Sequence, residues 1–251
     1  MKIFRFCGMA LVAVCMCVNF TACSSGDGLD DGEGSSINEK KLTKMVFDGE
    51  PFTFSYDNQG RVIEVVDVYA YGESTSYYYI WDDDAIIVNS KTEVVNPDGY
   101  TEKHTDRHIY SIDNKRVQSS GENENIETYY YNNQNRLSQI KSRWDIDDYL
   151  WDGDKLIAVN DGSDKYTYKE SCKKGYSPLF VMRINSDPLF MAHPEIIGVR
   201  TEQLPATITE TLNDGSTKIY TYSYTFDNEG YISKIEIANN EKKSTCILTW
   251  E

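Results

Sequence analysis

The stretch FSYDNQGRVIEV, Phe54 to Val65, contains the pattern that decides the fold of this chain. A large aromatic residue begins it, a second follows two places later, and Asp57 opens a short polar turn before an apolar strand start. Residues two apart in a strand point to the same face, so Phe54 and Tyr56 mark one buried face. An Asp followed by Gly60 is typical of a tight turn. The stretch therefore predicts two antiparallel strands joined by a hairpin turn.

Five related stretches follow, and their starts lie 25, 31, 19, 20 and 75 residues apart. Spacings of about 20 residues fit one strand pair for each repeat. Positive φ is expected at Gly60, Asn135 and Gly230 in the turns. These repeats predict a mostly-β fold, an antiparallel meander of hairpins forming a strongly curved sheet or partial barrel. The five stretches are YIWDDDAIIV (79–88), YSIDNKRVQ (110–118), YYYNNQNRLSQI (129–140), YLWDGDKLIAV (149–159) and YTFDNEGYISKI (224–235).

The longest gap between repeats holds an insert at about residues 172–205, with four of the six prolines of the chain. Its segments PLFVMRI and PLFMAHPEII are apolar and begin with proline, which favours short helical or irregular structure. We expect the insert to pack across the sheet or to close one end of it. Residues 41–251 are thus predicted to form a single β-rich domain, with a further hairpin at Asn213–Gly215.

The first 22 residues have the features of a signal peptide: Lys2 and Arg5, then an apolar run of 15 residues from Phe6 to Phe20. The run ends in Phe-Thr-Ala before Cys23, which resembles a bacterial lipobox and predicts lipidation of Cys23. Phe stands where Leu is commoner, and an ordinary secretory signal cut nearby is the alternative. Acyl chains on Cys23 would anchor the mature chain to a membrane.

Residues 23–40 form a predicted tether, rich in Gly, Ser and acids, with a span on the order of 20 Å. An acidic stretch behind a lipidated cysteine is similar to the export signal of surface lipoproteins in Bacteroidetes. That similarity implies an outer-membrane lipoprotein on the cell surface; a spacer facing the periplasm is the alternative. Removing the signal leaves 23 basic against 40 acidic residues, which excludes nucleic acid as a partner class.

The lipobox, the hairpins with Y-x-[YFW]-D-x-x-G-[RY]-[VIL], the Pro-rich insert and the LPATIT segment resemble a family of gut Bacteroidetes lipoproteins. That family is catalogued as a domain of unknown function with a porin-like fold. The hairpins are also similar to YD repeats of Rhs-type proteins. The resemblance covers most of residues 41–251 and implies a curved antiparallel sheet or partial barrel. It carries over no catalytic residue, and the charged turns argue against a lipid-facing band.

Clustered acids at 82–84, 145–148, 152–154 and 161–164 lie in or beside predicted turns, where turn chemistry explains them. A calcium site is the alternative, although no EF-hand pattern is present. His104 and His108 are too far apart on a strand to share a metal ion, and His193 is expected to be structural. Because nucleophile and nucleotide motifs are absent, we predict no cofactor, no metal and no enzymatic activity.

Tyrosines outside the repeat register are the candidate ligand-facing aromatics: Tyr69, Tyr71, Tyr78 and Tyr130. Cys172 and Cys246 remain after the signal and the anchor are set aside, and either a disulfide or two buried thiols would suit an oxidising compartment. The favoured function is a non-catalytic binding or accessory role with a glycan or protein ligand. A polysaccharide hydrolase with a carboxylate pair and a purely structural envelope component are the alternatives.

Overall fold

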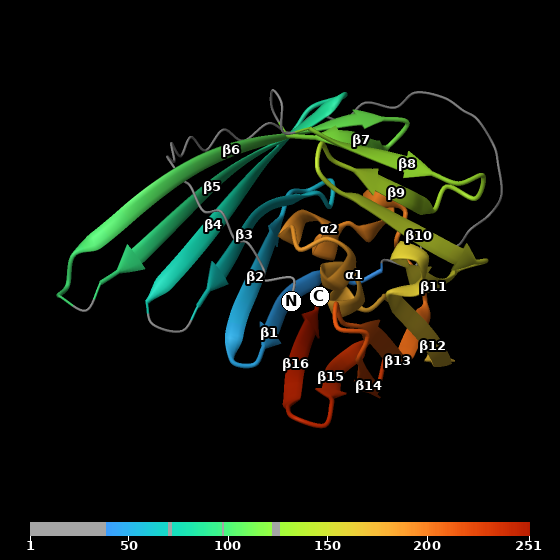
Figure 1. Cartoon of the computed structure of the whole chain (residues 1–251). Coiled ribbons are helices and arrows are strands. Elements are labelled where there is room, and N and C mark those ends of the chain that lie inside the picture. Colours follow the sequence, from blue (N-terminus) through green and yellow to red (C-terminus); the bar gives the residue numbers. More distant parts are fainter. Residues whose placement is uncertain (1–38, 70–71, 97, 122–125) are drawn as a thin grey trace.

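The computed structural model describes residues 39–69, 72–96, 98–121 and 126–251, and its sixteen antiparallel strands form a closed barrel (Figure 1). Each strand pairs with its neighbours in sequence, and β1 pairs with β16 to close the ring. The predicted antiparallel meander is confirmed, and its curvature continues to closure. The strands are β1 (Leu42–Phe47), β2 (Glu50–Tyr56), β3 (Val62–Val68), β4 (Glu73–Trp81), β5 (Ala85–Val95), β6 (Thr101–Asp113), β7 (Arg116–Ser120), β8 (Glu127–Tyr131), β9 (Leu137–Lys141), β10 (Ile146–Asp152), β11 (Lys155–Val159), β12 (Asp164–Ser171), β13 (Gln203–Thr211), β14 (Thr217–Phe226), β15 (Ile232–Ala238) and β16 (Lys243–Trp250). The helical elements are η1 (Asn160–Gly162), α1 (Pro178–Ile184), α2 (Pro188–Ala192) and η2 (Pro194–Ile197).

The two ends of the barrel differ in construction. At one end, here the turn rim, each even-numbered strand leads into the next odd-numbered strand, so all six repeated turns lie there. Asp57 Oδ1 accepts hydrogen bonds of 2.9 Å from the backbone N–H groups of Gln59 and Arg61. Asn132 and Asp227 make the same pair of bonds in their own turns. The opposite end, the open rim, carries turns of several different types.

Positive φ occurs at the three predicted turn positions, with values of 84° at Gly60, 57° at Asn135 and 94° at Gly230. The predicted alternation of faces is also confirmed, because Phe54, Tyr79 and Tyr149 are buried inside the barrel while the residue that follows each is exposed.

In four of the six repeats the second large residue faces inward and also ties two strands together, and in the sixth repeat the first aromatic, Tyr224, does so. Trp151 Nε1–H donates to the carbonyl oxygen of Leu137, at the start of the preceding strand, over 2.6 Å. Bonds of this kind, which we call aromatic clamps, leave seven of the eight even-numbered strands, at 2.5 to 2.9 Å. Strand β6 has Ile112 at this position, whose side chain carries no donor. The clamps join Tyr56 to Leu42, Trp81 to Val62, Tyr131 to Val117, Trp151 to Leu137, Tyr168 to Leu156, Tyr224 to Pro205 and Trp250 to Ile232.

A basic residue after several of the turns packs on the ring of the next clamp. The guanidinium of Arg136 lies 5.2 Å from the centre of the Trp151 ring, and that of Arg61 lies 5.9 Å from the Trp81 ring. Such cation–π contacts contribute on the order of 0.5–1 kcal/mol each at partly exposed sites. Three repeats thus hold the next strand pair through both a carbonyl group and an arginine: Arg61 with Val62, Arg116 with Val117 and Arg136 with Leu137.

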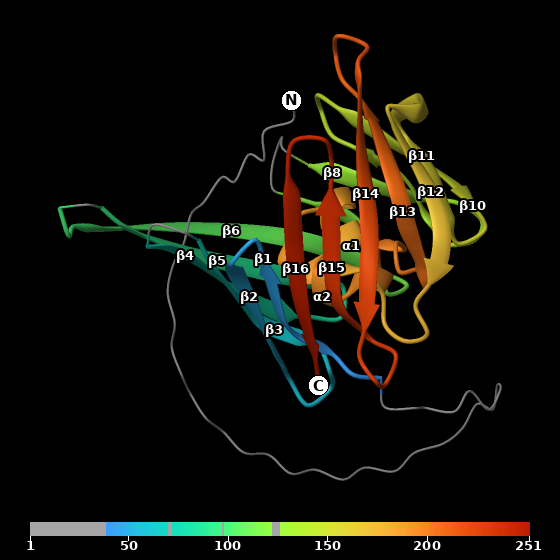
Figure 2. The same cartoon turned by 90° about the horizontal axis from the view of Figure 1, so that it is seen from below.

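The insert between β12 and β13, residues 172–202, fills the barrel interior, and we call it the plug (Figure 2). Its aromatic rings pack against the wall on several sides. The ring centres of Phe190 and Tyr110 of β6 lie 5.1 Å apart, and those of Tyr176 and Trp250 of β16 lie 5.4 Å apart. The predicted short helical segments are present. These segments lie at the centre of the barrel, instead of across the sheet or at one end as expected, because their apolar residues meet the inward faces of the whole ring.

The two short helices of the plug begin alike. Ser177 and Asp187 accept hydrogen bonds from backbone N–H groups in the first turn, and a proline occupies that turn in each case. The plug contacts the turn rim at Gly198, where an added Cβ would lie 2.5 Å from the carbonyl oxygen of Asn135. In the part of the chain that the structure describes, no helix is long and apolar enough to cross a membrane.

Cys172 and Cys246 are buried free thiols, so the disulfide considered from the sequence is not formed. Cys172 follows β12 and Cys246 lies on β16, with three strands between them in the ring. The Cys172 thiol contacts the carbonyl oxygens of Gly175 and Glu202, both at 3.3 Å. Burial raises the pKa of Cys172 to about 11 and that of Cys246 to about 12, which keeps both as thiols.

Candidate functional site

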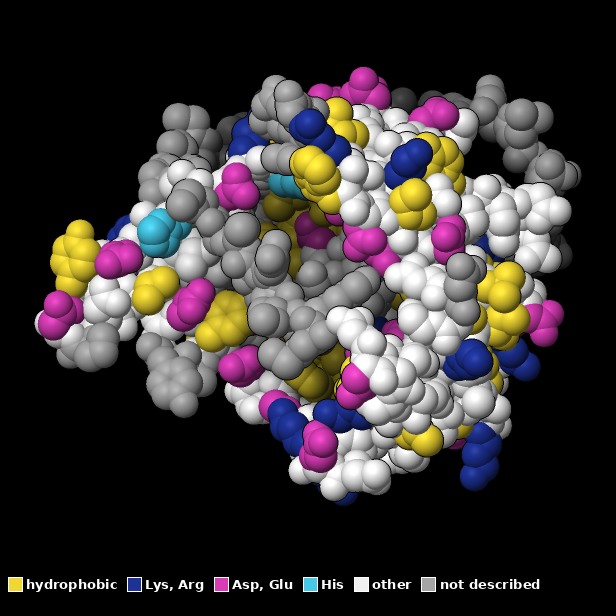
Figure 3. Space-filling model, in the orientation of Figure 1, with side chains coloured by type: hydrophobic (Ala, Val, Ile, Leu, Met, Phe, Trp, Pro, Cys, Tyr) yellow, Lys and Arg dark blue, Asp and Glu magenta, His cyan; other side chains and the backbone are white. Residues whose placement is uncertain are grey.

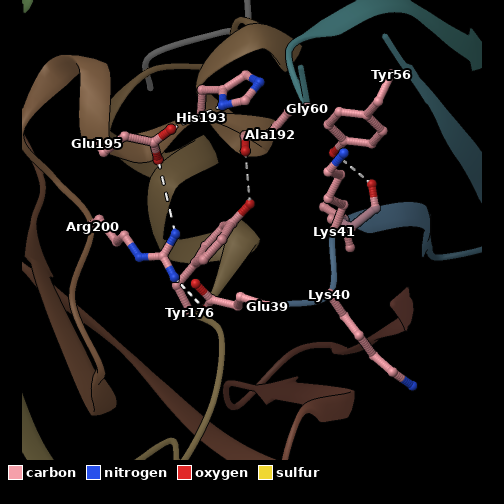
Figure 4. A pocket seen from close by; sticks show the side chains of 11 residues that line it. Glu39, Lys40, Lys41, Tyr56, Gly60, Tyr176, Ala192, His193, Glu195 and Arg200 are labelled. Atoms are coloured by element: carbon pink, nitrogen blue, oxygen red, sulfur yellow. Dashed lines mark hydrogen bonds and ion pairs between the residues drawn. The ribbon is translucent and has the colours of Figure 1, made fainter. Parts of the chain in front are cut away.

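Two cavities lie at opposite ends of the barrel. The smaller, of about 130 Å³, lies at the turn rim between the plug and the start of β1 (Figure 4). Val62 N–H donates to His193 Nε2 over 3.0 Å, and His193 Nδ1 lies 2.9 Å from Glu195 Oε1. His193 Nε2 is therefore an acceptor and cannot also take a proton from a substrate.

The rest of this small cavity is held by contacts between the plug and the wall. Arg200 pairs with Glu39, and the Tyr176 hydroxyl donates to the Met191 carbonyl oxygen over 2.7 Å. Burial raises the pKa of the Glu195 carboxyl, but the His193 hydrogen bond and the nearby charges outweigh it and leave that pKa below its usual value. We interpret this cavity as a structural joint. The structural role expected of His193 agrees with these contacts, although the nearby Glu195 was overlooked as its partner.

The larger cavity, of about 630 Å³, opens at the other end and is our candidate site. Strands β6, β7, β8, β9 and β10 form its wall, and the loop between α1 and α2 forms its floor. Its volume lies in the range typical of small-molecule sites, roughly 300–1,000 Å³. The wall carries Asp106, Arg107, His108, Tyr110, Ser120, Gly121, Glu127, Ile140 and Asp147, and the floor carries Ile184, Asn185 and Ser186.

A hydrogen-bond network fixes the floor of this cavity. Asp187 accepts hydrogen bonds from the Tyr110 hydroxyl at 2.5 Å and the Tyr79 hydroxyl at 3.2 Å, and it also caps α2. Asn185 donates to the Tyr129 hydroxyl over 3.3 Å. Burial, and next the charge of Asp187, raises the pKa of Tyr110 well above its usual value, so this hydroxyl stays protonated. The loop is held to the wall before any ligand arrives.

Carboxylates dominate the wall. Glu127 Oε2 accepts from the Ser120 hydroxyl at 3.1 Å, and Asp147 Oδ1 accepts from Asn160 Nδ2 at 2.6 Å. Asp106 is exposed on β6, beside the half-buried His108. The arrangement offers several oxygen acceptors to a ligand that carries hydroxyl or N–H donors. Among the described residues, no group of three or more His, Cys, Asp or Glu side chains could hold a metal ion.

The acid clusters seen in the sequence divide into two kinds. Asp82, Asp83 and Asp84 are exposed in a turn, as predicted. Asp147 instead lies on β10 and lines the larger cavity, while Asp164 begins β12 and pairs with Arg183 of the plug at 3.0 Å. Turn chemistry alone is therefore the wrong explanation for these two acids. His108 is half-buried against the Tyr110 ring.

The four candidate tyrosines are not brought together. Tyr71 lies outside the described residues, and Tyr69 is half-buried after the end of β3. Tyr78 is half-buried on β4, and Tyr130 is 45% exposed on β8. None of the three described tyrosines lines the larger cavity. The aromatic residue beside that cavity that the sequence reasoning missed is Trp144, which is 81% exposed in the turn between β9 and β10. Its position outside the aromatic-x-aromatic register was the available signal.

No protein-family model matches the sequence, and a search of curated proteins found no match. Two solved structures are similar. One is a porin-like protein from Bacteroides uniformis ATCC 8492, with 15% identity, a TM-score of 0.47, and coverage of 84% of this chain and 98% of that chain. The other is a porin-like protein from Bacteroides vulgatus ATCC 8482, with 15% identity, a TM-score of 0.30, and coverage of 84% and 99%.

Both structures are described as porin-like, as is the family that the sequence resembles. The lipobox and the similarity to YD repeats remain predictions, and Cys23 lies outside the described residues. The barrel assignment rests on the strand pairing described above.

Proposed function

We propose that this protein is a lipid-anchored, non-catalytic binding protein of the outer membrane, displayed at the cell surface, and that the larger cavity binds a glycan. The observation that carries the proposal is the acceptor-rich cavity at the end of the barrel away from the predicted anchor.

The positions of the two chain ends support an orientation of the barrel relative to the membrane. Lys41 and Glu251 exchange two backbone hydrogen bonds, of 2.7 and 2.9 Å, so both ends of the barrel domain lie at the turn rim. An anchor at Cys23 would connect to the barrel just before Glu39, at that rim. The turn rim would then face the membrane, and the open rim would face away from it.

The side chains on the outer wall support a position of the barrel outside the lipid bilayer. Ion pairs cross its outward face, as between Lys91, Glu93 and Lys103. Acidic and basic side chains are also interspersed over the end of the barrel that is seen in Figure 3. The apolar residues fill the interior around the plug instead. A membrane-spanning barrel needs an outward apolar band about 25 Å tall, whereas the outward face here mixes charged side chains with scattered apolar ones such as Ile80 and Leu150.

The chemistry of the cavity favours a sugar. Pyranose rings present many hydroxyl donors, and the wall offers carboxylate acceptors on β6, β8 and β10. A fixed floor reduces the ordering cost of binding.

The proposal is tested with the mature chain carrying Cys23→Ser, which stays unlipidated and can be studied in solution. A glycan array selects a ligand, and calorimetry measures its affinity. Asp106→Asn should weaken binding about tenfold, because an amide replaces a charged acceptor. The matched control is Asp98→Asn, an exposed turn residue of the same rim outside the cavity lining, which should bind like wild type. Failure to bind any glycan would overturn the proposal.

Anchoring is tested separately in cells. Labelling with a palmitate analogue should mark the wild-type chain and not Cys23→Ala, and added protease should reach the wild-type protein on intact cells. A labelled but protected protein would place it on the periplasmic face.

A polysaccharide hydrolase is the second candidate, because Asp106, Glu127 and Asp147 line one cavity. Paired carboxylates are what glycoside hydrolysis uses. Release of reducing ends from a bound glycan, lost in both Glu127→Gln and Asp147→Asn, would favour the hydrolase over the binding role. A purely structural envelope role predicts instead a stoichiometric protein partner and no glycan.

A further inference from the structure

The four tryptophans of the chain are used in two different ways. Three of them are aromatic clamps, whose indole N–H groups donate to backbone carbonyl oxygens at 2.6 to 2.7 Å. Trp144 is 81% exposed, and its indole N–H has no hydrogen-bond partner among the described residues. Tryptophan is usually well buried, because its ring gains much from leaving water. An indole left in solvent therefore needs an explanation.

The turn that carries Trp144 is well ordered. Ser142 N–H donates to the Asp145 carbonyl oxygen at 2.9 Å, and Ser142 Oγ accepts from the backbone N–H groups of Trp144 at 3.2 Å and Asp145 at 2.9 Å. The Arg143 guanidinium lies 4.8 Å from the centre of the indole ring. Three hydrogen bonds thus fix the backbone of the turn, and the cation–π contact places a guanidinium against the exposed ring.

This turn lies at the edge of the larger cavity. It joins β9 to β10, and Ile140 and Asp147, on either side of the turn, both line that cavity. Ile146 is 45% exposed beside the same turn, so the edge offers apolar surface next to an acceptor-rich wall.

We propose that Trp144 is a stacking platform for a second sugar ring, next to the ring held in the cavity, so that the ligand is an oligosaccharide. The inference rests on the proposed glycan-binding function. A pyranose ring has an apolar face of C–H groups that packs on an aromatic ring, while its hydroxyls are satisfied at its edges. The cavity supplies the acceptors and Trp144 supplies the flat surface.

The test uses the unlipidated mature chain and the oligosaccharide selected on the array. Acrylamide quenching of tryptophan fluorescence should report mainly on Trp144, because the other three indoles are buried or half-buried. Bound oligosaccharide should reduce the quenching. Trp144→Ala should weaken oligosaccharide binding about tenfold, whereas Trp144→Phe, which keeps a ring, should lose less than about threefold.

Tyr130→Ala is the matched control. It removes an exposed aromatic from β8 at a position outside the cavity lining, and it should bind within about twofold of wild type, since it removes no stacking contact. Normal binding by Trp144→Ala together with unchanged quenching, in a protein whose binding depends on Asp106, would overturn the platform and leave the proposed function standing. Absence of glycan binding in the wild type would overturn both.

Discussion

The two rims of the barrel differ in how neighbouring strands are tied together. At the turn rim, three of the six repeat turns, opened by Asp57, Asn132 and Asp227, have the same side-chain hydrogen bonds, clamps tie strands together, and both ends of the barrel domain meet. At the open rim the turns vary in length, the larger cavity opens, and the most exposed tryptophan lies in solvent. The clamps thus lie at one rim and the candidate site at the other. The predictions below perturb one rim or the other.

The largest expected effect comes from bringing a methyl group between the plug and the turn rim. Gly198→Ala combines a positive φ of 68° with a Cβ placed 2.5 Å from the Asn135 carbonyl oxygen. Backbone strain and overpacking together should lower the free energy of unfolding by about 4 kcal/mol. Urea denaturation measures the loss.

The matched control for Gly198→Ala is Gly215→Ala at the open rim. Gly215 also has a positive φ, of 80°, but an added Cβ meets nothing within 4 Å. It should cost only about 1 kcal/mol, from strain alone. Equal losses at the two glycines would show that the close approach of plug and wall does not matter for stability.

The next effect is a pH dependence from Asp67, near the open-rim end of β3. This carboxyl is fully buried, with the Tyr69 side chain beside it. Burial, with the charges of Glu50 and Glu73, outweighs the influence of Tyr69 and raises the pKa of Asp67 to about 7. The folded state therefore holds a proton that the unfolded chain releases near pH 4.

Stability should consequently fall as the pH rises from about 4 to about 7 and then level off, with an upper size on the order of 4 kcal/mol. Asp67→Asn cannot ionise, so it should remove this component. The measurement is the free energy of unfolding of wild type and variant from pH 4 to 8. A difference between the two that stays constant over this range would refute the assignment.

A smaller effect isolates one aromatic clamp. Tyr168→Phe removes only the hydroxyl that donates to the Leu156 carbonyl oxygen at 2.8 Å. It should cost about 1 kcal/mol, because a buried carbonyl group loses its partner. Tyr130→Phe, an exposed position on the outer wall, should change stability by less than about 0.3 kcal/mol. Identical thermal and urea unfolding of the two variants would remove the clamps as a stabilising feature.

The repeats made much of this fold predictable. Alternation around Phe54 and Tyr79 gives the buried face, and Asp57 with Gly60 gives the turn, because these are local properties of strands and hairpins. Closure of the barrel was harder to predict from the sequence, since β1 pairs with β16 about 200 residues away and the hairpin pattern alone does not set the curvature of the sheet. The plug position was also not predictable, because apolar length and proline content specify short helices but not the surface they meet.

The candidate site was the least predictable part. Asp147 and Trp144 belong to a stretch of acids and aromatics whose composition is that of any turn, and only the ring closure places Asp147 in one cavity with β6 and the plug. The search among off-register tyrosines followed the right principle, since function was sought where the repeat breaks. It missed Trp144 because only tyrosines were considered as ligand-facing aromatics.

The most direct test of the account measures stability and glycan affinity together for one variant from each rim. Tyr168→Phe should lower the free energy of unfolding by about 1 kcal/mol and leave affinity unchanged. Trp144→Ala should weaken oligosaccharide binding about tenfold and change stability by less than about 0.5 kcal/mol. The account would be contradicted if Trp144→Ala destabilised the barrel as much as the clamp variant while binding remained normal.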